Sequence, residues 1–424
     1  MTHALRSALL VILTLAMGSP AAHAHETRSN ETRSGEISST ENRSGETRRF
    51  KSKSYDITTD LPNDLAREVA AHMDAVHAEY TQRFRAYGKR NNEALRLWVF
   101  ADRDGYQRFL AGHEINSTGS AGMFFRRDDA SGLTAYLAPR NKDAMLETLR
   151  HEGMHQFLYQ RIGDNLPPWI NEGMAEWFGY ALETERGFEM GLADPRAINR
   201  LHRRLDDGSL VTLDQLLGLS QKEWNERNRN GGNAGQYDAA WSVVHFLAFG
   251  ENGRYARLLD QLLKLFWQGV DADRAAQQVF GGDVATLNTK WQAYVRALQP
   301  DELYLARDVL EVYSVVMWAL RAQEIEPMTP IEFDRAILEH GETLDLPKSL
   351  MTSVGEQKFT LDDDAWWRTL PEAARNGKPA KLRFIPDRRG KQPPAIEIQG
   401  LKRRVTLQWN IGEDGVPAPT IEYR

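Results

Sequence analysis

The 424-residue sequence contains no cysteine. Disulfide bonds are therefore excluded, and any bound metal ion must be held by histidine or carboxylate side chains. Basic residues form no stripe along the chain, whose net charge is −6 with both signs mixed. We therefore expect no nucleic-acid partner.

Long apolar runs are also missing, apart from Ala8 to Met17 near the N-terminus. This run follows Arg6 and precedes Ala22-His23-Ala24, which is the pattern of a signal peptide and its cleavage site. We predict that residues 1–24 direct export and are removed after Ala24, which gives a periplasmic or extracellular protein with no membrane span. Two alternatives stay open: an uncleaved membrane anchor, and a eukaryotic secreted protein that is glycosylated at its Asn-x-Ser/Thr sites.

Residues 25–53 have almost nothing apolar to bury. Copies of a five-residue unit such as Glu-Thr-Arg-Ser-Gly, one of them degenerate, fill most of this stretch, and the unit carries both charges. Such a composition cannot offset the entropy lost on folding. We predict a disordered tether over residues 25–53, with the folded part beginning near Ser54.

The next part of the chain alternates between helical and strand patterns. Apolar spacing predicts a helix over residues 65–84, capped by Asp60, then strands at 95–100, 122–126 and 133–137. Helical patterns follow. This order predicts one α+β domain over residues 54–300.

Around residue 300 the pattern changes. Helices are predicted over residues 303–322 and 330–340, followed by four strands. The last two strands flank Gly412-Glu413-Asp414-Gly415, a hairpin signal. We predict a small C-terminal α/β accessory domain over residues 301–424, which carries no pattern typical of a catalytic site.

One short motif carries the chemistry. His151-Glu152-Gly153-Met154-His155 has the form H-E-x-x-H inside a predicted helix from Lys142 to Ile162. Residues i and i+4 lie on the same face of a helix, so both imidazoles can bind one zinc ion. Glu152 is then positioned as the general base for a metal-activated water.

A second motif follows at the distance that a third ligand needs: Asn171-Glu172-Gly173-Met174-Ala175-Glu176. Catalytic zinc takes three protein ligands and keeps one position open. We predict one zinc ion per chain, bound by His151, His155 and Glu172. Glu176, one turn later, is predicted to accept a hydrogen bond from the ring N–H of a ligating histidine. The alternatives are ordinary histidines on an amphipathic helix and a surface carboxylate at position 176.

Together, the two motifs resemble those of gluzincin metallopeptidases, the superfamily of thermolysin and aminopeptidase N. The stretch from Gln236 to Leu247 and the ending from Phe280 to Tyr294 also resemble a peptidase-MA-like family of exported bacterial proteins of unassigned substrate. The resemblance covers roughly residues 90–300. It implies a thermolysin/aminopeptidase-like catalytic domain, in which a small mixed sheet adjoins a helical lobe with the H-E-x-x-H helix.

The resemblance implies further roles. In aminopeptidase-like gluzincins a tyrosine at about the distance of Tyr237 donates its phenol to the oxyanion; the alternative is that Tyr237 packs in the core. Aminopeptidases of this superfamily also place a glutamate after a Gly-x-Met sequence on the sheet's edge strand. Here Met123 is followed by Phe124, which favours cleavage within a chain over amino-terminal trimming. We expect Gly122, Met123 and Phe124 to pair with an extended substrate.

These observations predict an exported zinc-dependent endopeptidase whose partner is a peptide or protein substrate. Two alternatives stay open. One is a non-catalytic binding protein that keeps the peptidase fold. The other is an amidase or peptidase that acts on cell-wall peptides. Nothing in the sequence indicates an oligomeric state.

Overall fold

The computed structural model describes residues 47–89, 93–117, 119–127, 131–138, 142–164, 166–229, 233–352, 355–371, 379–387, 392–411 and 417–424. The predicted signal peptide and most of the predicted tether lie outside these residues, as does the predicted turn at 412–415.

The chain forms two compact units whose segments alternate along the sequence. Unit 1 comprises the chain up to Gly179 with Leu217–Asn225 and Val243–Ala285, and unit 2 comprises Tyr180–Leu216, Glu226–Ser242 and Thr286–Arg424. This division differs from the single boundary expected near residue 300.

Unit 1 is built on a five-stranded mixed sheet in the order β1-β2-β3-β5-β4. The strands are β1 (Arg48–Lys51), β2 (Asp56–Thr59), β3 (Arg96–Asp102), β4 (Gly122–Arg126) and β5 (Ser131–Ala138). β2, β3 and β5 run parallel, whereas β1 and β4 are antiparallel to their neighbours. β4 therefore lies at an edge of the sheet, as the resemblance to gluzincins implies.

Strand β1 lies in the stretch expected to be tether. Its four residues pair with β2 in antiparallel register, with Phe50 opposite Ile57. Regular structure is therefore already present before Ser54. A four-residue strand with one large apolar side chain is too short to show a periodicity of its own.

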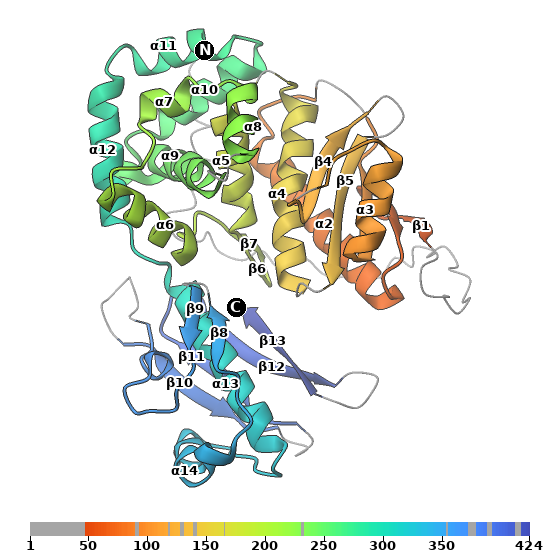
Figure 1. Ribbon diagram of the computed structural model, residues 1–424, viewed down its shortest axis with the longest axis vertical. Helices are drawn as coiled ribbons and strands as arrows, with labels where there is room; N and C mark the ends of the chain where they lie inside the picture. Colours follow the sequence, from red (N-terminus) through yellow and green to blue (C-terminus); the bar gives the residue numbers. More distant parts are fainter. Residues whose placement is uncertain are drawn as a thin grey trace, which may run out of the picture. The chain divides into compact units, whose positions relative to one another are not determined.

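Helices cover both faces of this sheet (Figure 1). The helices of unit 1 are α2 (Asn63–Arg83), α3 (Arg103–Gly112), α4 (Lys142–Arg161), α5 (Pro168–Gly179), α10 (Ala256–Trp267) and α11 (Ala272–Phe280). Helices α7 (Leu213–Leu217), α8 (Gln221–Arg229), α9 (Asn233–Gly253) and α12 (Val284–Ala297) run from one unit into the other.

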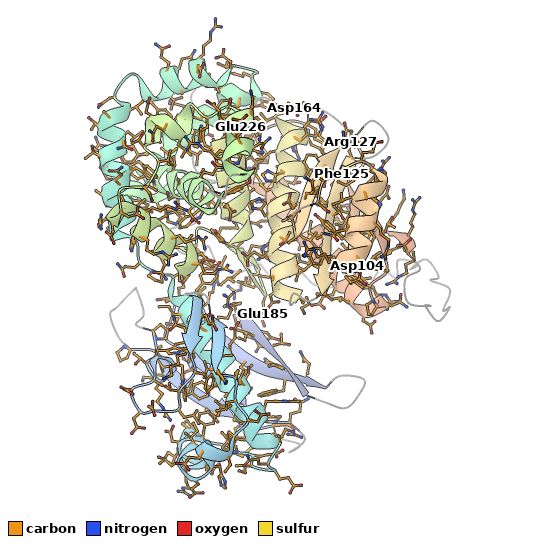
Figure 2. All side chains as sticks on the ribbon, in the orientation of Figure 1. Asp104, Phe125, Arg127, Asp164, Glu185 and Glu226 are labelled. Atoms are coloured by element: carbon orange, nitrogen blue, oxygen red, sulfur yellow. The ribbon has the colours of Figure 1, made fainter. Side chains whose placement is uncertain are left out.

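Two apolar clusters show which helix covers which face. One cluster joins α2 and α4 to strand residues such as Leu97 and Leu133. The other joins α3 to strand residues such as Phe100 and Phe125, the latter labelled in Figure 2. Alternate residues of a strand point to opposite faces, so α2 and α4 cover one face of the sheet and α3 the other.

Unit 2 has its own core. Its elements are β6 (Leu182–Thr184), β7 (Gly187–Glu189), α6 (Pro195–Asp206), α13 (Glu302–Arg321), α14 (Pro330–His340), the 3-10 turns Gly341–Thr343 and Trp366–Arg368, β8 (Ser349–Thr352), β9 (Gly355–Lys358), β10 (Lys381–Ile385), β11 (Ala395–Gln399), β12 (Val405–Ile411) and β13 (Pro417–Tyr423). Strands β10 to β13 form an antiparallel sheet in sequence order, and α13 packs on it.

Residues from before position 300 complete this second core. Leu182 and Leu192 are buried in the same apolar cluster as α13 and the β10–β13 sheet. The guanidinium of Arg403 pairs with Glu189 at 2.9 Å. The segment that starts at Tyr180 therefore folds with the C-terminal part of the chain.

The predicted α+β class is confirmed, but one predicted cap is wrong. Asp60 does not cap α2, whose N-cap is Pro62 without a side-chain hydrogen bond. The Asp60 carboxylate instead accepts the backbone N–H of Ala101 at 2.6 Å. Among the described residues, no helix is long and apolar enough to span a membrane.

Candidate metal centre

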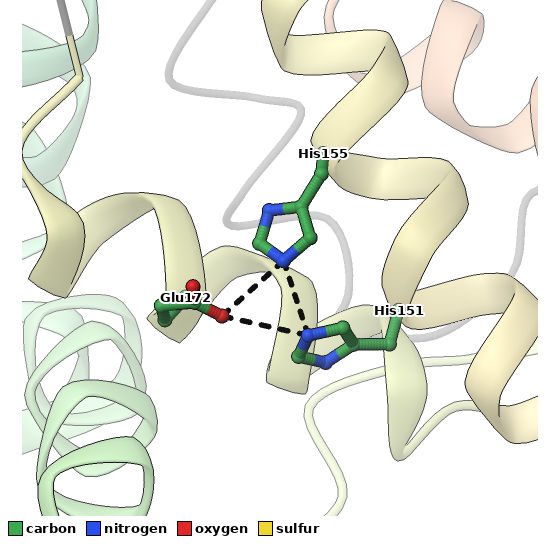
Figure 3. A group of neighbouring side chains, drawn as sticks. All are labelled: His151, His155 and Glu172. Atoms are coloured by element: carbon green, nitrogen blue, oxygen red, sulfur yellow. Dashed lines mark hydrogen bonds and ion pairs between the residues drawn. The ribbon is translucent and has the colours of Figure 1, made fainter. Parts of the chain in front are cut away.

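Helices α4 and α5 bring the predicted ligands together. α4 ends at Arg161, and Gly163 follows with a φ of 92°, a left-handed conformation that suits glycine. The chain reverses and α5 begins at Pro168, whose ring suits the first helical position. Glu172 on α5 thereby comes to face the two histidines of α4 (Figure 3).

Three donor atoms meet at this point. The Nε2 atoms of His151 and His155 lie 3.1 Å apart. Oε2 of Glu172 lies 3.5 Å from Nε2 of His151 and 3.2 Å from Nε2 of His155. All three side chains are largely buried, with 11 to 16% of their area exposed. The triad can therefore hold a metal ion.

A bound metal ion explains two features of the triad better than hydrogen bonds among its three side chains do. The two Nε2 atoms face each other, and they would repel if both carried hydrogen. Oε2 of Glu172 is buried without a hydrogen-bond partner in the described part of the chain. A buried carboxylate oxygen without a donor is costly unless a cation neutralises it.

A glycine lets α2 pack closely on the motif helix. A Cβ at Gly153 would lie 3.2 Å from Cε of Met73 and 3.3 Å from Oη of Tyr80, both on α2. The phenol of Tyr80 donates to the carbonyl of Arg150 at 2.5 Å. Glycine at position 153 therefore leaves room for α2 against the motif helix.

Arg150 fixes the second helix to the first. Its guanidinium donates to the carbonyl of Gly179, the last residue of α5, from Nη2 at 2.9 Å and from Nε at 3.3 Å. Arg150 is 9% exposed, and its Nη1 lies 3.5 Å from Nε2 of His72. A buried guanidinium at the C-terminal end of a helix offsets the partial negative charge of the exposed carbonyls there.

Strand β4 lies close to α4 because residue 122 is glycine. A Cβ at Gly122 would lie 2.6 Å from Cγ2 of Thr148 on α4 and 2.9 Å from the carbonyl oxygen of Thr134 on β5. This approach brings the backbone N–H of Phe124 within 2.7 Å of Oε2 of Glu152, to which it donates. The proposed base is therefore held by the edge strand.

Carboxylates dominate the electrostatics of the centre. Burial lowers the pKa of His151, but Glu176, Glu172 and Glu152 outweigh it and raise this pKa to about 10. The pKa of His155 is also raised, because Glu172 outweighs the effect of burial. Burial raises the pKa of Glu172, yet the two histidines lower it to about 2. The carboxylates around the two histidines therefore favour positive charge at this centre.

The remaining predicted side chains take different positions. Oε1 of Glu176 lies 3.6 Å from Nδ1 of His151, beside the ring nitrogen it was predicted to orient, at ion-pair rather than hydrogen-bond distance. Nδ1 of His155 is buried without a hydrogen-bond partner among the residues described. His245 is buried beside Phe249.

The side chains of the predicted substrate-binding stretch lie on both faces of β4. Phe124 is half-buried on the face covered by α4, where its ring lies 5.9 Å from that of Tyr159. Met123 and Phe125 pack into the cluster on the other face. The Met123 side chain therefore faces away from the triad. Its main-chain groups alternate with those of Phe124 and face β5, so Met123 is not placed for the predicted role.

Tyr237 belongs to unit 2 and is half-buried near the start of α9. Its phenol oxygen accepts a hydrogen bond from Nδ2 of Asn228 at 3.0 Å. Oδ1 of Asn228 in turn accepts from Nε2 of Gln236.

The match with known families covers this centre. A family model described as "Protein of unknown function (DUF1570)" matches residues 145–264, which include the triad, Glu152 and Tyr237. The match spans less than half of the chain. None of the curated proteins matches the sequence.

Proposed function

We propose that this chain is an exported zinc-dependent peptidase of gluzincin type that cleaves within peptide chains. The observation that carries the proposal is the triangle of donor atoms, with sides of 3.1, 3.2 and 3.5 Å. Donors bound about 2.0 to 2.1 Å from a tetrahedral zinc ion lie about 3.3 Å from one another.

The chemistry of the donor set supports zinc. Two imidazoles and one carboxylate form a three-ligand set that leaves a fourth position open. His151, His155 and Glu172 would hold the ion, which would supply a Lewis acid for a peptide carbonyl. The buried, negative surroundings of the triad favour a divalent cation.

Glu152 is the proposed general base. Its Oε2 accepts the N–H of Phe124 at 2.7 Å, which fixes the carboxylate beside the triad and leaves its other oxygen for proton transfer. In the proposed reaction Glu152 takes a proton from the attacking water. The carboxyl group then gives this proton to the leaving amine as the C–N bond breaks.

The edge strand β4 is the proposed substrate track. The N–H of Phe124 points to Glu152, so in an antiparallel pair the carbonyl of Phe124 also faces away from β5. The main-chain groups of Arg126, two residues later, face the same way. An extended peptide can pair with these outward groups next to the base.

Tyr237 is the proposed donor to the oxyanion, a role carried over from the resemblance to gluzincins. The hydrogen bond from Asn228 to the phenol oxygen supports it, because an oxygen that accepts a hydrogen bond is a stronger donor through its own O–H.

The decisive experiment compares wild type with Glu152→Gln on a broad peptide library. Zinc content is measured for both proteins. Asp143→Asn, an exposed carboxylate on the same helix, is the matched control. We expect zinc in all three proteins and cleavage by wild type and Asp143→Asn alone.

Other outcomes separate the alternatives. If neither wild type nor Glu152→Gln cleaves any peptide although both bind zinc, the result would support a non-catalytic binding protein. Cleavage of muropeptides but not of casein would support a cell-wall amidase or peptidase. Export is tested by sequencing the N-terminus of the secreted protein, which should begin at His25.

A further inference from the structure

We infer that a cavity beside the metal centre binds a cationic group of the substrate, an ammonium or a guanidinium. The inference rests on the proposed function and names its substrate class. The cavity has a volume of about 240 Å³ and is lined by Ala121, Gly122, Glu147, Thr148, His151, Glu152, Glu176 and Gly179.

The position of the cavity ties it to the reaction centre. His151 and Glu152 form part of its wall, as does Gly122 at the start of the edge strand β4. A group that enters it therefore lies against a metal ligand and the base. A site of this size holds one side chain or terminal amine, since whole-ligand sites are about 300 Å³ or more.

The charge of the lining selects a cation. Glu147, Glu152 and Glu176 supply carboxylates, and the described residues of the lining include no lysine or arginine. A cation in such a place gains charge-assisted hydrogen bonds, whereas a carboxylate would be repelled.

Glu147 is the specificity residue within this lining. Glu152 is held by Phe124 for proton transfer, and Glu176 lies beside Nδ1 of His151. Glu147 lies one helical turn before His151 on the same face of α4, and neither the triad nor the proton transfer needs it.

The rest of the wall suits the stem of a basic side chain. The hydroxyl of Thr148 donates to the carbonyl of Ala144 at 3.0 Å, and its methyl group faces Gly122. Gly122 and Gly179 present backbone without side chains. Lysine and arginine bury an apolar stem while their charged ends stay paired with polar groups.

The test uses matched peptide pairs. Lysine is compared with norleucine and arginine with citrulline at positions flanking the scissile bond. Each peptide is made with a free and an acetylated N-terminus. Preference for the basic side chain in both forms identifies a side-chain subsite, whereas loss of cleavage on acetylation identifies a subsite for the terminal amine.

Glu147→Gln is measured against wild type, with Asp143→Asn as the control one turn earlier on the same helix. We expect wild type and Asp143→Asn to favour the cationic member of a pair by about tenfold or more in kcat/KM, because a hydrogen bond to a charged group is lost in the neutral one. Glu147→Gln should lower this ratio toward one while its zinc content stays unchanged. Added salt should lower the wild-type ratio. An equal ratio in wild type and Glu147→Gln overturns the inference.

The two proposals fail in different ways. If wild type cleaves peptides without preference for a cation, the result supports the peptidase activity and overturns the inference about the cavity. If wild type cleaves no peptide, fluorescence anisotropy measures binding of the same labelled pairs to the intact protein. Tighter binding of cationic peptides that Glu147→Gln abolishes then supports the cavity, and equal binding of both members overturns it.

Discussion

The backbone N–H of Phe124 donates to Oε2 of Glu152 across 2.7 Å, and it joins the edge strand to the proposed base. The bond uses an N–H that points away from β5, so the sheet does not need it. The strand that would carry the substrate thus also positions the carboxylate that would activate water.

Replacing Phe124 with proline removes this donor. We expect kcat to fall about tenfold, because a misaligned base loses part of its catalytic advantage, while KM changes little. Relative to Phe124→Leu, which also loses the aromatic ring, stability should change little, since proline is tolerated on an edge strand where its nitrogen faces outward. Phe124→Leu keeps the N–H and is the control. Equal kcat values for the two variants would contradict a positioning role.

Gly122 controls how closely β4 approaches α4. Gly122→Ala places a methyl group 2.6 Å from Cγ2 of Thr148 and 2.9 Å from a backbone oxygen, so the strand must shift. We expect a loss of about 1 to 3 kcal/mol in the free energy of unfolding, together with reduced activity. Adding Thr148→Ser removes one of the two clashes and should restore part of both losses. No rescue would mean that the backbone contact dominates.

Arg150 holds α5 to α4 through the carbonyl of Gly179. Arg150→Met keeps much of the side-chain volume but removes both hydrogen bonds, and we expect a loss of about 2 kcal/mol in stability. Because Glu172 lies on α5, zinc affinity should fall as well, by about 10- to 100-fold. Chemical unfolding and competition with a chelator measure the two effects. Unchanged zinc affinity would show that the triad does not depend on this link.

Tyr237→Phe tests the role carried over from gluzincins. We expect a fall in kcat of about 100-fold with unchanged zinc content, because only the transition state gains from an oxyanion donor. Asn228→Ala should cause a smaller fall, and it should add nothing to Tyr237→Phe, since it acts through the phenol. A higher KM with an unchanged kcat would instead point to a role for Tyr237 in substrate binding.

The metal centre could be predicted from the sequence because the residues that form it lie close to one another along the chain. The H-E-x-x-H spacing fixes two ligands on one face of α4, and Glu172 follows after a short reversal marked by Gly163 and Pro168. Helix boundaries fell within a few residues for the same reason.

Long-range contacts could not be predicted. Arg150 and Glu147 belong to no motif, and what they do depends on Gly179 and on the cavity wall, which only the folded chain brings near. Strand β1 and the β6–β7 hairpin are too short to show periodicity. The backbone contact between Glu185 and Tyr423 has no local signal at all, so the sequence does not predict that residues 180–216 group with the C-terminal sheet.

Protonation of the triad should be linked to zinc binding and to stability. The pKa of His151 is raised from 6.5 to about 10, so in chelator-treated protein its stabilising effect is complete below pH about 6.5 and is lost as the pH rises through about 10. The pKa of Glu172 is lowered from 4.5 to about 2, so its effect is present above pH about 4.5 and is lost as the pH falls through about 2. Both contributions are therefore complete only between these limits, at pH values of about 4.5 to 6.5.

Zinc needs an unprotonated imidazole, so its binding at about pH 7.5 should displace at least the proton of His151. Calorimetry in two buffers of different ionisation enthalpy counts the protons released. Glu176→Gln removes the carboxylate that raises the pKa of His151 most, and it should reduce the number released, whereas Asp143→Asn should not. Zinc binding without proton release by wild type would show that His151 is already neutral, and that the surrounding carboxylates do not raise its pKa as described.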